Sequence, residues 1–118
     1  MDLTFLIPVK LESQDRVRNL TTVISYLLHN YDAKIIVKER DTEPRFESLV
    51  GTELKDCINY SFEKQTQSFF HKTKLLNDMI EMSTTEVVAN YDTDVVLPIS
   101  SVNKAYEMIK SGESDAVY

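Results

Sequence analysis

The chain has 118 residues, of which 42% are hydrophobic, and this composition fits one globular domain with a core and excludes a disordered protein. Its 19 acidic residues outnumber the 13 basic ones and give a net charge of −6, which argues against a general nucleic-acid-binding or anionic-membrane-binding surface. The single cysteine excludes an internal disulfide framework, and the start "MDLTFLIPVK" lacks the features of a signal peptide or membrane span. We therefore expect a cytoplasmic or cytoplasm-facing protein.

The first part of the chain predicts two buried strands around one amphipathic helix. The apolar run Leu3–Val9 is typical of a strand buried on both faces, and Pro8 is expected to end it because proline lacks the N–H that a ladder needs. Apolar side chains then recur at three- and four-residue spacing, which predicts a helix over about 14–30 with Ser13 as its cap. The run Ala33–Glu39 predicts the second buried strand.

The second part of the chain is more polar and predicts shorter elements. In chain order they are a short helix near 45–50, a weaker strand over 57–62 that buries Cys57, a helix over about 73–82, a strand over 85–91, a helix opened by Pro98 and Ser100 and stopped by Gly112, and the beginning of a strand at 115–118.

Strands that alternate with helices predict an α/β fold, with a three-layer arrangement and a mostly parallel sheet flanked by helices. We expect residues 1–118 to be a single domain or a fragment of one. Ligands of such sheets bind beyond the carboxyl ends of the strands. The candidate segments are therefore Pro8–Lys10, Glu39–Asp41 and Asp92–Asp94.

The pair Asp92 and Asp94 has two interpretations that the residues alone leave open. Aspartates at a strand end are common in turns. Alternatively, residues i and i+2 of an extended segment point the same way, so both carboxylates can face one Mg²⁺ or Mn²⁺ beside a diphosphate. A calcium-binding EF-hand is excluded, because no glycine and glutamate follow at the required spacing. A phosphoacceptor receiver domain is disfavoured, because the segment after the first strand holds only one acid, Glu12.

The stretch "FFHKTKLLNDMIEMSTTEVVANYDTDVVLP" resembles A-type glycosyltransferases, and is most similar to the β-1,4-galactosyltransferase and chondroitin-polymerase type. That type places an aromatic-x-basic-x-Lys-Leu-Leu-Asn helix start before an Asp-x-Asp motif, an apolar pair and proline. "LTFLIPVK" and "AKIIVKE" are similar to the first two strands of family 2 glycosyltransferases. The resemblance covers nearly the whole chain and implies a nucleotide-diphospho-sugar transferase fold, represented by its amino-terminal, nucleotide-binding part.

The resemblance also implies roles for individual residues. Asp94 would bind Mn²⁺ or Mg²⁺, and Asp92 would share the metal or contact the nucleotide. The nucleotide-sugar site implied in this way consists of Pro8, Val9, Lys10, Glu39, Phe70, Lys72, Asn77 and Asp92. Within it, Phe70 would lie against uracil, Lys72 would take the place of an arginine, and Glu39 would contact the base or ribose.

The expected function is the donor-binding part of a metal-dependent glycosyltransferase that uses a uridine-diphosphate sugar and a carbohydrate acceptor, as in polysaccharide biosynthesis. The acceptor-binding half is expected to be absent, which leaves the catalytic base unknown and this part inactive by itself. An open sheet edge would then favour a homodimer. The alternative is a non-catalytic nucleotide-binding or scaffold domain. A nucleotidyltransferase ranks lower, because "PVKLESQDR" lacks the glycine-rich loop of that class.

Overall fold

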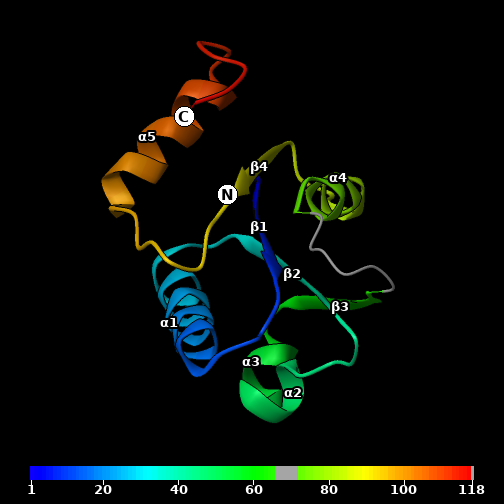
Figure 1. Cartoon of the computed structure of the whole chain (residues 1–118). Helices are drawn as coiled ribbons and strands as arrows, with labels where there is room; N and C mark the ends of the chain where they lie inside the picture. The colour runs from blue at the N-terminus through cyan, green and yellow to red at the C-terminus, as the bar shows by residue number, and fades with distance from the viewer. Residues whose placement is uncertain (66–71, 118) are drawn as a thin grey trace.

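The computed structural model describes residues 1–65 and 72–117 of the chain (Figure 1). The elements in chain order are β1 (Leu3–Val9), α1 (Gln14–Asn30), β2 (Lys34–Asp41), α2 (Phe46–Leu49), α3 (Thr52–Asp56), β3 (Asn59–Lys64), α4 (Lys72–Met82), β4 (Val87–Asn90) and α5 (Ile99–Lys110). Among the helices of this described part, none is long and apolar enough to cross a membrane.

The four strands form one parallel sheet in the order β3-β2-β1-β4. β1 is therefore flanked on both sides, by β2 from Thr4 opposite Lys34 and by β4 from Leu3 opposite Val87. Parallel neighbours require crossover connections, and helices supply them here. This arrangement confirms the predicted α/β class with a parallel sheet and flanking helices.

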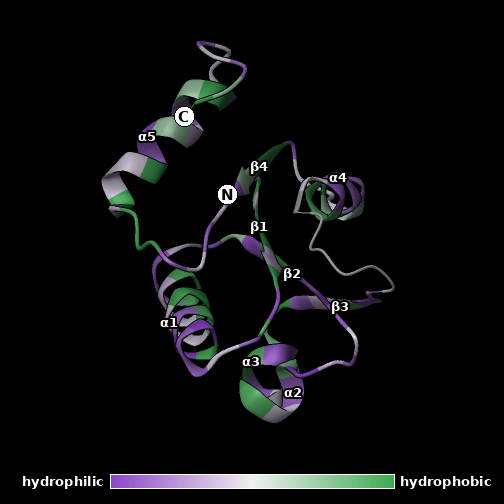
Figure 2. Ribbon diagram, in the orientation of Figure 1, coloured by the Kyte–Doolittle hydropathy of each residue, from purple (hydrophilic) through white to green (hydrophobic). Residues whose placement is uncertain are grey.

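Helices cover both faces of the sheet and complete three layers. On one face, Phe5 of β1 packs in a core with the apolar side of α1 and with Phe46 of α2, and partly buried side chains of α5 join it. On the other face, which α4 covers (Figure 1), Leu6 and Ile36 pack with Met79 of that helix. The part of the connection between β4 and α5 that lies next to α5 is hydrophobic but exposed, and it consists of Val95, Val96 and Leu97 (Figure 2). Successive side chains of β1 face opposite sides of the sheet, so this strand contributes residues to two separate cores.

Most predicted elements are present, and two local predictions are wrong. Cys57 is exposed at the end of α3, a helix that the sequence analysis did not predict, and β3 begins only at Asn59. Cys57 therefore precedes the strand that was expected to bury it and is not one of its residues. Residues 115–117 form no strand, and Tyr118 lies outside the described residues.

Pro8 also departs from expectation, because it lies inside β1 and does not end it. The register with β2 continues to Val9 opposite Glu39. On the other side of β1, the Leu6 carbonyl accepts the N–H of Tyr91 at 3.0 Å, just beyond the end of β4. Backbone groups two residues apart in a strand face the same neighbour, so the missing N–H of Pro8 points to where β4 has already ended.

The start of the chain ties β4 and α5 to the sheet. The carboxylate of Asp2 accepts the backbone N–H of Glu86 at 3.1 Å and the ammonium group of Lys110 at 3.2 Å. Lys110 also binds the carboxylate of Glu86 at 2.9 Å, and the N–H of Asp2 donates to the hydroxyl of Tyr106 at 2.9 Å. The Glu86 N–H and, after it, Lys110 lower the pKa of Asp2.

We predict that Asp2→Asn lowers the free energy of unfolding at pH 7 and that this loss disappears in acid. The pKa of Asp2 is lower in the folded protein than its ordinary value of 3.8, so its stabilising effect is complete above pH 3.8 and is lost as the pH falls through the folded value. Urea denaturation of both proteins at pH 7, 5 and 3 measures the difference. Asp32→Asn, at an exposed position, is the control. A difference that stays constant down to pH 3 would contradict the prediction.

Candidate functional site

The carboxyl edge of the sheet holds a cleft of about 560 Å³, within the size range of small-ligand sites. The end of β1, the beginning of α1 and the segment after β4 form its walls. The residues that line it are Pro8, Lys10, Glu12, Arg16, Asp92, Thr93 and Asp94. Two cations and three carboxylates thus share one open hollow, and this arrangement is suited to a polar, charged ligand.

Three hydrogen bonds hold the segment after β4 in place, two of them with α1 and one with the buried Tyr91 at the beginning of the segment. The Leu97 carbonyl accepts the hydroxyl of Tyr26 in α1 at 2.8 Å, and the Leu97 N–H donates to the hydroxyl of Tyr91 at 2.9 Å. Nearer the cleft, the side-chain amide of Asn19 donates to the carboxylate of Asp94 at 3.2 Å. The aspartate segment is therefore fixed at its far end by two tyrosines and oriented at Asp94 by α1.

Asp92 and Asp94 fit a divalent cation by their donor chemistry. Both side chains are exposed, both line the cleft, and both offer the carboxylate oxygens that Mg²⁺ and Mn²⁺ prefer. Within residues 1–65 and 72–117, no group of three or more His, Cys, Asp or Glu side chains could enclose a metal. The two aspartates therefore suit a cation that one or two carboxylates bind and that takes its other ligands from phosphates and water.

The structure brings together four of the residues that the sequence analysis nominated. Pro8 and Lys10 from the end of β1 line the same cleft as Asp92 and Asp94 from the segment after β4. Val9 does not join them, because it is only 5% exposed and packs in the core below α1. The alternation of a strand explains this difference, since neighbours in sequence face opposite sides.

The predicted contributions from α4 and from the preceding segment remain predictions. Asn77 is exposed on α4 and does not line the cleft. Phe70 lies outside the described residues. Lys72 is the first residue of α4, and its side chain also lies outside what the structure describes.

Glu39 is buried, with an exposed fraction of 0%, and does not line the cleft. Its carboxylate accepts the backbone N–H groups of Arg45 at 3.1 Å and Phe46 at 3.2 Å, and the hydroxyl of Tyr60 at 2.6 Å. Burial, followed by the bond to Glu39, raises the pKa of Tyr60 and keeps this donor protonated. The carboxylate thus holds the connection from β2 to α2, and a contact with a base would require it to give up these donors.

The contribution of α1 to the cleft was not predicted from the sequence. Glu12 and Arg16 line it, and Asn19 orients Asp94. These residues follow one another at four- and three-residue spacing, which places them on one face of the chain as it enters and continues α1. The signal in the sequence that could have identified them is the polar face of the first helix, which directly follows the strand whose carboxyl end borders the cleft.

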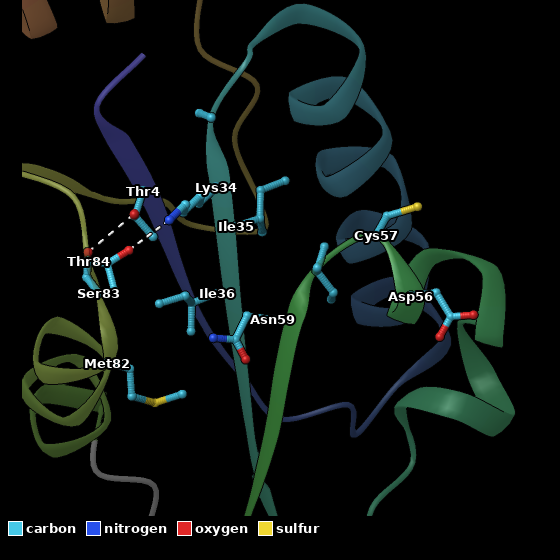
Figure 3. A pocket seen from close by; sticks show the side chains of 12 residues that line it. Thr4, Lys34, Ile35, Ile36, Asp56, Cys57, Asn59, Met82, Ser83 and Thr84 are labelled. Carbon is cyan, nitrogen blue, oxygen red and sulfur yellow. Dashed lines mark hydrogen bonds between the residues drawn. The ribbon is translucent and has the colours of Figure 1, made fainter.

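A second cavity, of about 450 Å³, lies at the opposite edge of the sheet, where β1, β2 and β3 begin (Figure 3). Four of its polar side chains bond in pairs: Lys34 donates to the hydroxyl of Thr84 at 2.8 Å, and Ser83 donates to that of Thr4 at 3.2 Å. Ligands of parallel α/β sheets bind at the carboxyl edge, so the cleft beside the two aspartates is the stronger candidate.

Comparisons with known proteins find one curated relative and several solved structures that are similar to this chain at low sequence identity. No protein-family model matches the chain. A protein of Sulfolobus acidocaldarius named "Probable glycosyltransferase" is 28% identical over 120 residues, and the match covers 98% of this chain and 25% of that protein. The chain therefore spans about a quarter of the length of this curated relative.

Two solved structures share the fold at low sequence identity. A Desulfovibrio desulfuricans protein described as a "putative nucleotide-diphospho-sugar transferase" has a TM-score of 0.62 and 11% identity, over 92% of this chain and 55% of that one. Residues 1–349 of S. aureus TarS give a TM-score of 0.67 and 15% identity, over 98% of this chain and 34% of that one. The chain thus has the α/β fold of nucleotide-diphospho-sugar transferases.

We predict that Glu39→Gln lowers the free energy of unfolding by about 1–3 kcal/mol, because it weakens hydrogen bonds to a buried charged acceptor. Thermal or urea denaturation measures this loss. Glu81→Gln, an exposed change on α4, is the matched control and should stay within about 0.5 kcal/mol of wild type. Equal stabilities of the two variants would show that the Glu39 carboxylate does not hold the connection from β2 to α2.

Proposed function

We propose that the chain is the donor-binding part of a glycosyltransferase. In this proposal the cleft binds a nucleotide-diphosphate sugar, with uridine as the nucleoside, for transfer of the sugar to a hydroxyl group of a carbohydrate acceptor. The observation that carries the proposal is the position of Asp92 and Asp94 beside Pro8 and Lys10, in one cleft at the carboxyl edge of a sheet with the nucleotide-diphospho-sugar transferase fold.

The charges of the cleft support a diphosphate ligand. Asp92 and Asp94 would hold Mn²⁺ or Mg²⁺, and this cation would supply Lewis-acid stabilisation of charge on the diphosphate. Lys10 lines the same cleft and would contribute a positive charge from the protein itself. Asn19 would keep Asp94 in a fixed orientation through the bond at 3.2 Å.

The two hydrogen bonds at Leu97 also support the proposal, because they preorganise the segment that carries the aspartates. Tyr26 and Tyr91 fix the end of the segment that carries the aspartates, so little conformational freedom has to be lost when a ligand binds. Electrostatic stabilisation of a leaving diphosphate depends on charges that are already in position.

We predict that the wild-type chain binds uridine diphosphate in the presence of Mn²⁺ and that Asp94→Asn weakens this binding at least about tenfold. Loss of a residue that hydrogen-bonds to a metal ligand typically lowers metal affinity or activity about 10- to 100-fold. Loss of a metal ligand itself should weaken binding by no less. Isothermal titration calorimetry with Mn²⁺, and again with a chelator, measures the effect.

The control for this titration is Asp32→Asn, which removes an exposed carboxylate just before β2, at the opposite edge of the sheet. It should bind uridine diphosphate as wild type does. Metal-independent binding by wild type, or equal binding by the two variants, would contradict the assignment of the aspartates to the cation. A folded wild-type chain that does not bind the nucleotide would contradict the proposed donor site.

A further inference from the structure

Arg16 occupies the wall of the cleft that faces the aspartate segment. Its guanidinium Nε lies 3.5 Å from a carboxylate oxygen of Glu12, and both side chains are about half exposed, at 48% and 53%. Both residues line the cleft. An exposed ion pair of this kind stabilises a protein by only about 0–1 kcal/mol. An anion that binds the guanidinium group more tightly can therefore displace the Glu12 carboxylate.

We propose that Arg16 binds the diphosphate of the ligand and that Glu12 is its partner in the ligand-free protein. This inference rests on the proposed donor site. It adds Arg16 as a phosphate-binding residue and Glu12 as a carboxylate that competes with the diphosphate for Arg16. The guanidinium presents donors in a planar fork that matches phosphate oxygens, whereas the ammonium group of Lys10 is a point charge. The diphosphate takes the place of the Glu12 carboxylate on Arg16.

The position of Arg16 on α1 explains why this residue serves the cleft and its neighbour Arg18 does not. Arg18 is the other arginine of α1, its side chain is 74% exposed, and it lies 3.9 Å from Asp15. Two residues along a helix point to different sides, and Arg18 does not line the cleft. The beginning of α1 thus carries two similar exposed ion pairs, Arg16 with Glu12 and Arg18 with Asp15, and of these the first lies in the cleft.

The same helix also reaches the metal-binding side of the cleft. Asn19, one turn after Arg16, donates to Asp94 at 3.2 Å. α1 therefore carries a cation for the phosphates and an amide that orients a carboxylate for the metal. As negative charge develops on a departing diphosphate, Arg16 stabilises it from this fixed helix.

The test compares Arg16→Gln with Arg18→Gln by calorimetric titration of uridine diphosphate with Mn²⁺. Arg16→Gln should weaken binding about tenfold or more, since it removes charge-assisted hydrogen bonds to phosphate, and Arg18→Gln should stay within about twofold of wild type. Arg16→Lys should lie between them, because lysine keeps the charge but loses the fork. The affinity for Mn²⁺ alone, followed by electron paramagnetic resonance, should be the same in all of them.

The competitor role of Glu12 has its own pair of variants. Glu12→Gln frees Arg16 and should raise the affinity for uridine diphosphate about twofold to fivefold, whereas Asp15→Asn, which removes the partner of Arg18, should leave it unchanged. This pair decides the question if Arg16→Gln fails to fold. Unchanged affinity in Glu12→Gln would then overturn the inference.

The outcomes separate this inference from the proposed function. If wild type does not bind uridine diphosphate, the donor site itself is wrong and the role of Arg16 fails with it. If wild type binds and Asp94→Asn does not, but Arg16→Gln binds as tightly as Arg18→Gln, the donor site stands and only the role of Arg16 is overturned. A loss of Mn²⁺ affinity in Arg16→Gln would also overturn it, because the residue would then act through the metal site.

Discussion

The parallel pairing of β1 with β2 on one side and β4 on the other is the constraint on which the cleft depends. Parallel strands all end at the same edge, so the residues after β1 and after β4 meet although more than 80 positions separate Lys10 from Asp92 in the sequence. The bond from the Tyr91 N–H to the Leu6 carbonyl is the last one of this ladder. Directly beyond it the chain leaves the sheet with Asp92, beside the end of β1.

Charge is concentrated in the cleft without being buried. Carboxylates that are exposed to water repel one another less than they would in the interior, so a chain with a net charge of −6 can keep three of them around one hollow. By contrast, the buried carboxylate of Glu39 has three donors, as a buried charge requires. The acids thus occupy two different environments: three line an exposed cleft, and Glu39 holds a loop from within the core.

The sequence predicted the sheet and half of the cleft because those features follow from short-range patterns. Buried strands appear as apolar runs, and the rule that ligands lie at strand carboxyl ends selected Lys10 and Asp94. Burial of Glu39 and exposure of Cys57 depend instead on which helix packs beside them, and no local pattern encodes that. The role of Arg16 was also hidden, because a charged residue on an amphipathic helix looks the same whether it faces a cleft or bulk water.

The most direct measurement of the central claim is a crystal structure of the chain with uridine diphosphate and Mn²⁺, with data collected at the manganese absorption edge. We predict an anomalous peak within coordination distance of Asp94, with the diphosphate between this ion and the wall of the cleft that carries Lys10 and Arg16. A nucleotide bound in the cavity beside Lys34 at the other edge of the sheet, or a manganese peak away from both aspartates, would contradict it.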